Sequence, residues 1–143
     1  GMKLSKNEER LLEALYELRG GNGLLSDLER VVPLAAIRDI CLGLARKKLL
    51  IVIKDQDDNS KFAYFYSMKI EGYIISSLLK NRKREMFLKD LKFSLPWYKK
   101  TRTKDNPIDR GIVRLSKMGL VEIEYKKEND TDRNFQEFIK YTN

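Results

Sequence analysis

One stretch of the sequence mixes basic and aromatic side chains, and this pattern is the clearest indication in the chain of a binding function. Between residues 80 and 104 there are ten Lys or Arg residues against only Glu85 and Asp90. The whole chain has 29 basic and 21 acidic residues and a net charge of +8, so this segment holds the entire excess. Cations neutralise phosphates, and aromatic rings stack on bases. The segment therefore predicts a nucleic-acid contact, and its candidate residues are Lys83, Arg84, Lys99, Lys100, Arg102 and Lys104, with Trp97 and Tyr98 beside them.

The chain offers little material for catalysis or for a metal site. It has no histidine, so imidazole can serve neither as a base nor as a ligand, and Cys41 is its one cysteine. There is no Gly-rich phosphate loop, no Gly-x-Ser-x-Gly element and no Cys–His arrangement. A nuclease built on Asp and Glu alone is the one enzymatic alternative left open. We expect a non-enzyme without a cofactor and without a bound metal.

Two halves of the sequence repeat the same apolar spacing. At an offset of 71, residues 44–52 match residues 115–123, and Ile37 and Cys41 match Ile108 and Ile112. At an offset of 63, Leu11 matches Ile74, and three further leucines also find apolar partners. The two offsets differ by eight residues, which predicts an insertion in the second copy between positions 91 and 108. The boundary between the copies is expected near residue 68.

Periodicity and cap signals predict three helices and a hairpin in each copy. Leucines from 11 to 18 form one apolar stripe, and Ser5 with Glu8 resembles a capping box. Pro33 is expected in the first turn of a third helix. The expected helices lie near 11–18, 26–31 and 33–46, then 70–79, 86–91 and 107–118, and the expected strands at 49–53, 62–66, 121–126 and 135–141.

This order resembles the winged-helix family, in which three helices precede a two-stranded wing. The telling piece runs from Ile108, Ile112 and Leu115 into Lys117-Met118-Gly119-Leu120-Val121, a basic helix end followed by a glycine turn and an apolar strand. The first copy departs from the pattern because Lys48 stands where Gly119 does. The resemblance implies an α+β, mainly α fold of two tandem winged-helix domains, residues 1–68 and 69–143.

The resemblance also implies that the third helix of a copy reads the DNA major groove and that the wing contacts phosphate. In the second copy this role falls on Arg110, Arg114 and Lys117, which the apolar stripe leaves on exposed faces. Asp109 argues against it, since a carboxylate repels phosphate. Ordinary solvated helix charges are the alternative interpretation.

The first copy has different chemistry. Its third helix exposes Leu42 among mixed charges, and its hairpin tip is acidic. Its strands carry Ile51 and Ile53 where the second copy has Glu122 and Glu124. A strand that is apolar on both faces is usually covered on both. We therefore expect Leu42, Ile51 and Ile53 at an interface, either under the second copy or under a partner subunit.

The sequence thus predicts a protein that binds double-stranded DNA through its second copy, with transcriptional regulation as the commonest role of this design. A protein-interaction adaptor in a transcription, replication or other assembly is the alternative, with a homodimer or a protein partner bound by the first copy. An RNA-binding role is a third option. No leader or membrane-spanning run is evident, so we expect a cytoplasmic protein, nucleoid-associated if it binds DNA.

Overall fold

The computed structural model describes residues 2–18, 21–56, 61–95 and 107–142. Within these residues the fold is α+β, with six helices and two three-stranded antiparallel sheets. The elements are α1 (Lys6–Glu17), β1 (Asn22–Leu24), α2 (Leu25–Val31), α3 (Ile37–Arg46), β2 (Leu50–Gln56), β3 (Phe62–Met68), α4 (Ile70–Lys80), β4 (Glu85–Phe87), α5 (Leu88–Phe93), α6 (Pro107–Lys117), β5 (Val121–Lys126) and β6 (Gln136–Tyr141).

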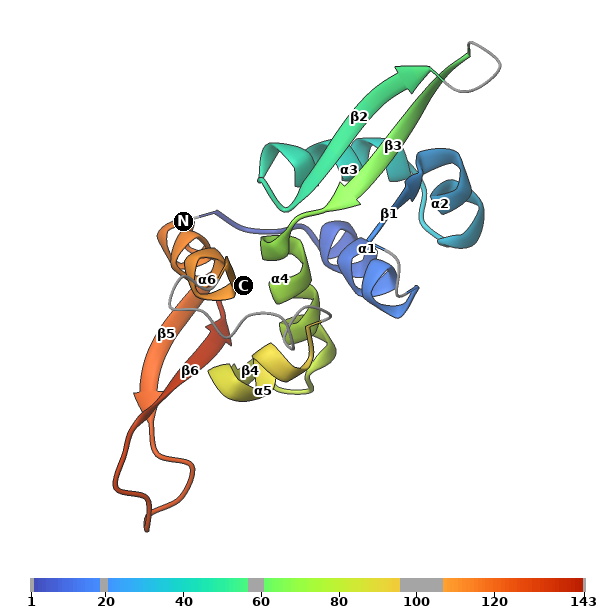
Figure 1. Ribbon diagram of the computed structural model, residues 1–143. Coiled ribbons are helices and arrows are strands. Elements are labelled where there is room, and N and C mark those ends of the chain that lie inside the picture. Colours follow the sequence, from blue (N-terminus) through green and yellow to red (C-terminus); the bar gives the residue numbers. More distant parts are fainter. Residues whose placement is uncertain (1, 19–20, 57–60, 96–106, 143) are drawn as a thin grey trace.

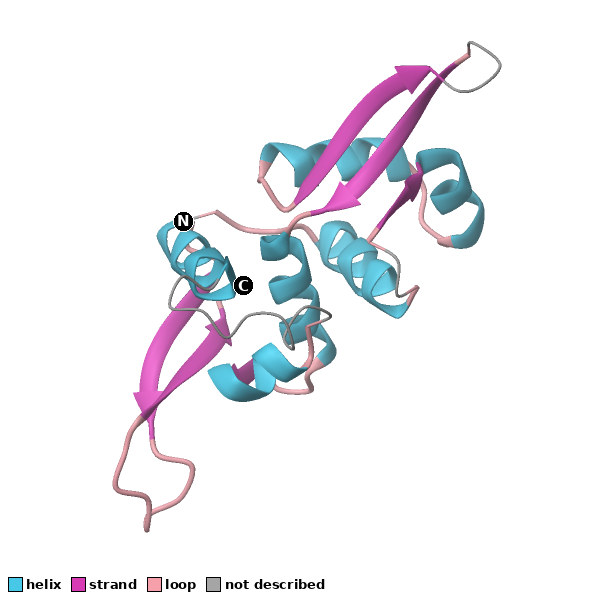
Figure 2. Cartoon of the chain, in the orientation of Figure 1, coloured by secondary structure: helices cyan, strands magenta, loops and turns pink. Residues whose placement is uncertain are grey.

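The element order occurs twice along the chain. Each half runs helix, short strand, two helices and a hairpin, and the sheets have the equivalent orders β1-β3-β2 and β4-β6-β5. The elements from α1 to α2 recur about 63 residues later, and those from α3 to β2 recur about 71 residues later. The offset therefore changes between α5 and α6, where the sequence placed the insertion. Figures 1 and 2 show the two hairpins extending from opposite ends of the molecule.

Each half also has a short third strand that the sequence did not predict. In the second half, β4 forms the beginning of the segment expected to be helical from residue 86, and α5 starts only at Leu88. β1 pairs with β3 through three residues, and β4 pairs with β6 through three. Strands this short carry no readable alternation, so periodicity could not find them.

The third helix of the first half starts later than predicted. Pro33 lies before α3, which begins at Ile37, and not in its first turn. Ala36 caps the helix in the left-handed region, with φ of 57°. That residue redirects the chain between α2 and α3, and alanine gives no sequence signal for a left-handed turn.

The two halves share one hydrophobic core, and α4 lies at its centre. Buried residues from both halves form a single cluster. Most of α4 is buried around its whole circumference, including the polar residues Glu71, Ser76 and Ser77. It packs against α1 of the first half and against α6 of the second. The repeat in sequence therefore describes the order of elements, while packing joins the two halves into one body.

Two glycines allow this close packing. A Cβ atom at Gly72 of α4 would lie 2.3 Å from the carbonyl oxygen of Leu49, at the start of the first hairpin. A Cβ atom at Gly111 of α6 would lie 2.7 Å from Cγ2 of Ile70 on α4. An added Cβ would press on backbone at Gly72 and on the Ile70 side chain at Gly111, so these glycines allow α4 to meet both halves closely.

The turn from the third helix into the hairpin is the same in both halves despite the different residues. Gly119 adopts φ of 81°, and Lys48 adopts φ of 63°. The amides of Leu49 and Leu120 donate equivalent hydrogen bonds to the carbonyls of Leu44 and Leu115, both at 3.0 Å. The exposed Lys48 therefore occupies a backbone conformation that favours glycine.

Replacing Lys48 with glycine should therefore raise the free energy of unfolding by about 0.5–1 kcal/mol, because glycine relieves the left-handed strain. Gly119→Ala should lower it by about 1 kcal/mol for the converse reason. Arg46→Gly, at an exposed right-handed helical position nearby, is the control and should be destabilising. Urea unfolding monitored by circular dichroism measures all three, and a destabilised Lys48→Gly variant would contradict the interpretation.

Candidate nucleic-acid interface

The exposed face of α6 carries the charges that the sequence assigned to it. Ile108, Ile112 and Leu115 are buried as predicted. Their neighbours Arg110, Val113, Arg114 and Lys117 follow i, i+3, i+4, i+7 spacing and are all exposed. These four residues, called the α6 stripe below, form one line along a helix of 11 residues.

Arg114 has a structural partner in addition to its place in the stripe. Its Nε donates to Oε1 of Glu71 on α4 at 2.5 Å. The Glu71 residue is only 4% exposed, while the Arg114 side chain is about half exposed. A buried carboxylate needs a cation or hydrogen-bond donors, so Arg114 contributes to the packing of α6 on α4 as well as to the surface.

The first half contains an equivalent ion pair. Glu8 of α1 lies 63 residues before Glu71, and its carboxylate accepts from Lys47 Nζ at 2.6 Å, just after α3. The same carboxylate accepts from the amide of Ser5, and Ser5 Oγ accepts from the amide of Glu8, which is the predicted capping box. Each half thus ties its first helix to its third helix by a buried glutamate. The 63-residue offset between the glutamates was a signal for this pairing, and sequence reasoning missed it.

Asp109 does not oppose phosphate binding as strongly as its charge suggested. Its carboxylate lies 3.1 Å from Nζ of Lys92 on α5. The pair compensates the negative charge at the start of α6.

Arg84 connects the halves and is not simply a surface cation. Its Nη1 lies 3.4 Å from Oε2 of Glu9, a buried residue of α1, and its guanidinium lies over the Tyr141 ring. Tyr141 Oη donates to the same Glu9 oxygen at 2.7 Å. Lys83, next to it, is exposed as expected. Of these two predicted contact residues, Arg84 is held by contacts within the protein, whereas Lys83 lies exposed at the surface.

Four of the predicted contact residues, Lys99, Lys100, Arg102 and Lys104, lie outside the described residues, as do Trp97 and Tyr98. The prediction that they contact nucleic acid therefore stays a prediction.

The apolar residues of β5 become more exposed toward the tip of the second hairpin. Val121 is buried and Ile123 is partly buried, but Tyr125, next to the end of β5, is 64% exposed. Cations lie over aromatic rings here, with Lys126 Nζ 4.2 Å from the ring centre of Phe138 and Lys127 Nζ 5.2 Å from that of Phe135.

The expectation that Ile51 and Ile53 lie under the second half is wrong. They are 44% and 51% exposed on the outer face of the first sheet, because the second half packs through α4 and not against this face. Ile53 is opposite Phe65 in the register, which extends the apolar face onto β3. Leu42 is partly exposed on α3. A partner subunit over these residues stays a prediction.

The described residues contain no cluster of His, Cys, Asp and Glu side chains suited to a metal ion. Burial, with the charge of Glu29 adding to it, raises the pKa of Cys41 to about 12, so this thiol is a poor nucleophile. None of the described helices is long and apolar enough to cross a bilayer.

Comparison with known proteins found no match among protein-family models, curated proteins or solved structures.

Removing the Arg114 side chain should destabilise the protein by about 1–3 kcal/mol, because Glu71 stays buried without its cation. Glu71→Gln in the Arg114→Ala background should recover part of that loss, since an amide is less costly to bury than an unpaired charge. Lys117→Ala, on the same exposed stripe, is the control and should change the unfolding free energy by under about 0.5 kcal/mol. Equal losses for Arg114→Ala and Lys117→Ala would refute a structural role for the pair.

Proposed function

We propose that each half of this chain is a winged helix and that the second half binds double-stranded DNA with α6 in the major groove. The element order of each half, with a three-stranded antiparallel sheet, supports the first part of the proposal. The α6 stripe supports the second part, and it is the observation that carries the proposal. Regulation of transcription is the role we infer for such a protein.

The stripe has the dimensions and chemistry that major-groove reading needs. Its four residues span roughly 10 Å along the helix axis, within the length that a recognition helix presents to a groove. Arg110 is near the helix N-terminus, the part that reaches base edges first, and its planar guanidinium suits a guanine edge. Val113 between the cations offers an apolar contact for a thymine methyl group. Lys117 at the other end is placed for a phosphate.

The equivalent positions of the first half lack this charge. At the offset of 71, Arg110, Val113, Arg114 and Lys117 correspond to Asp39, Leu42, Gly43 and Arg46. The α6 stripe has three positive charges, while its counterpart on α3 has one of each sign. Residues 69–143 carry 18 basic and 11 acidic residues against 11 and 10 in residues 1–68. Phosphate attraction therefore favours the second half alone.

Binding to a random-sequence duplex, measured by fluorescence anisotropy from low to moderate salt, tests the proposal. Arg110→Ala and Lys117→Ala should each weaken binding and reduce the slope of log K against log salt by about 0.9 where a phosphate contact is lost. Arg46→Ala is the matched control, since it removes the same charge at the equivalent position of α3. A further variant neutralises Lys99, Lys100, Arg102 and Lys104 together. It should bind all DNA sequences less tightly and to a similar degree.

Binding that Arg46→Ala weakens as much as Lys117→Ala would show that net charge alone, and not the α6 face, attracts DNA. No measurable duplex binding at 50 mM salt would refute the proposal. Tighter binding to single-stranded RNA than to the duplex would favour the RNA-binding role instead.

The exposed face around Ile51 and Ile53 favours a second function, protein interaction through the first half. Exposed apolar patches of this kind mark docking sites on soluble proteins. A homodimer covering this face should sediment as a dimer at tens of micromolar protein. The double variant Ile51→Glu with Ile53→Glu should then sediment as a monomer of unchanged stability, since both side chains are already exposed within one chain. A monomeric parent protein would exclude the homodimer.

A further inference from the structure

The central strand of the first sheet has an open edge at its outer end. β2 pairs with β3 over seven residue pairs, from Gln56 and Phe62 to Leu50 and Met68. On the other side, β1 pairs only with Phe65, Tyr66 and Ser67, because it ends at Leu24 and α2 begins there. In the described part of the chain, Phe62, Ala63 and Tyr64 therefore have no strand on that side.

The hydrogen-bonding phase of β3 is known from its inner end. The amide of Met68 donates to the carbonyl oxygen of Gly21, just before β1. In an antiparallel sheet, alternate residues direct their N–H and C=O groups to the same side. Tyr66, Tyr64 and Phe62 therefore direct theirs toward the β1 side, and Ala63 directs its own toward β2. The pairing of Leu24 with Phe65 directs the Leu25 amide at the Tyr64 carbonyl, so the open edge beyond β1 presents the Tyr64 amide and both backbone groups of Phe62.

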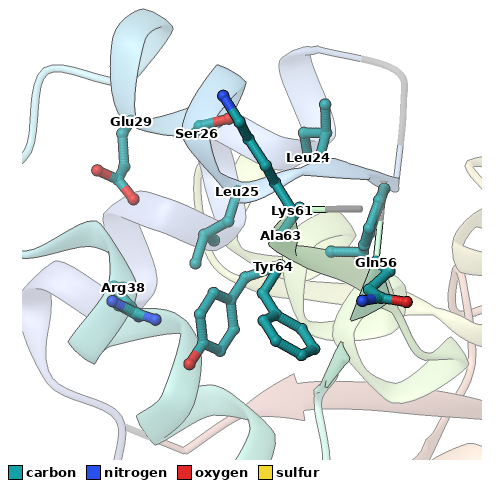
Figure 3. Close-up of a pocket in the computed structure, with 11 residues that line it drawn as sticks. Leu24, Leu25, Ser26, Glu29, Arg38, Gln56, Lys61, Ala63 and Tyr64 are labelled. Atoms are coloured by element: carbon teal, nitrogen blue, oxygen red, sulfur yellow. The ribbon is translucent and has the colours of Figure 1, made fainter. Parts of the chain in front are cut away.

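A hollow of about 650 Å³ lies beside this edge. Figure 3 shows Leu25, Ser26 and Glu29 of α2 on one side of it and Tyr64 of β3 with Arg38 of α3 on the other. The volume is within the range of protein binding sites. One wall is thus a row of backbone groups and the other a helix with mixed side chains, which is the setting in which proteins bind extended peptides by strand addition.

The charges around the hollow favour an acidic occupant. The Arg38 guanidinium lies 3.8 Å from the centre of the Tyr64 ring, and no carboxylate of the described residues pairs with it. Glu29 is the one carboxylate among the described residues that line the hollow.

We propose that the open edge of β3 binds an extended segment of a partner protein as an added strand, with an acidic side chain of that segment beside Arg38. Its backbone pairs with Phe62 and with the Tyr64 amide, and an apolar or β-branched residue contacts Leu24, which is partly exposed at the hollow. This site is separate from the α6 stripe, so it adds a protein partner to the proposed DNA binding and stands or falls independently of it.

Selection from a phage-displayed library of random linear heptapeptides, with the full chain as target, tests this proposal. The selected peptides should share an acidic residue and β-branched neighbours. Phe62→Pro removes the outward-facing amide of β3 but leaves the hydrogen bonds to β2. It should lower the affinity for the best peptide at least tenfold. Phe62→Ala is the matched control, because it removes the same ring and keeps the amide, and it should bind within about threefold of the parent.

Arg38→Gln provides a second test of the proposal and leaves the residues of β3 unchanged. This variant should bind the acidic peptide at least fivefold less tightly. Its affinity for a peptide with Gln in place of the acidic residue should equal that of the parent protein. Failure to select any peptide, equal binding by Phe62→Pro and Phe62→Ala, or an unaltered affinity in Arg38→Gln would each overturn the proposal. Peptide-free dimerisation that Phe62→Pro abolishes would identify a second copy as the occupant instead and would also overturn it.

Discussion

The contact of α4 with both halves is the constraint on which the rest of the structure depends. Gly72 lets the helix approach the backbone of Leu49, and Gly111 lets α6 approach Ile70, so one helix serves as the inner wall of two similar units. This helix is buried around its circumference, and the two sets of leucines and isoleucines form one core. Because the core is shared, the positions of α3 and α6 are fixed relative to each other.

The two halves share the same internal contacts and turns but differ in the residues on their surfaces. The pairs Glu8–Lys47 and Glu71–Arg114 each hold a first helix against a third helix, and Lys48 and Gly119 make the same turn. The outward residues are different, with cations on α6 and isoleucines on β2. Similar packing combined with different surface chemistry is what would be expected if the halves bind different kinds of partner.

The sequence predicted most of the helices and both hairpins, because their apolar periodicity records which face is buried. Ile108, Ile112 and Leu115 illustrate this, since their spacing alone identified the inward side of α6 and hence the exposed stripe. The strands β1 and β4 are too short for any periodicity, and the left-handed Ala36 carries no composition signal. Ile51 and Ile53 were misplaced because alternation shows that a face is apolar and does not show what covers it. Arg114 and Arg84 were identified as surface charges, yet their buried partners Glu71 and Glu9 come from distant segments that a local pattern cannot connect.

The two hairpins point away from each other on opposite sides of the shared helices. Molecules held at the α6 stripe and at the open edge of β3 would therefore be kept apart by the protein itself. Any cooperativity between them would pass through the contacts that join the halves, which are α4, packed against both α1 and α6, and the contacts of Glu9 with Arg84 and Tyr141. A rigid, fully packed helix transmits a shift only as a whole, so such a protein would act as a bridge holding two ligands at a set separation.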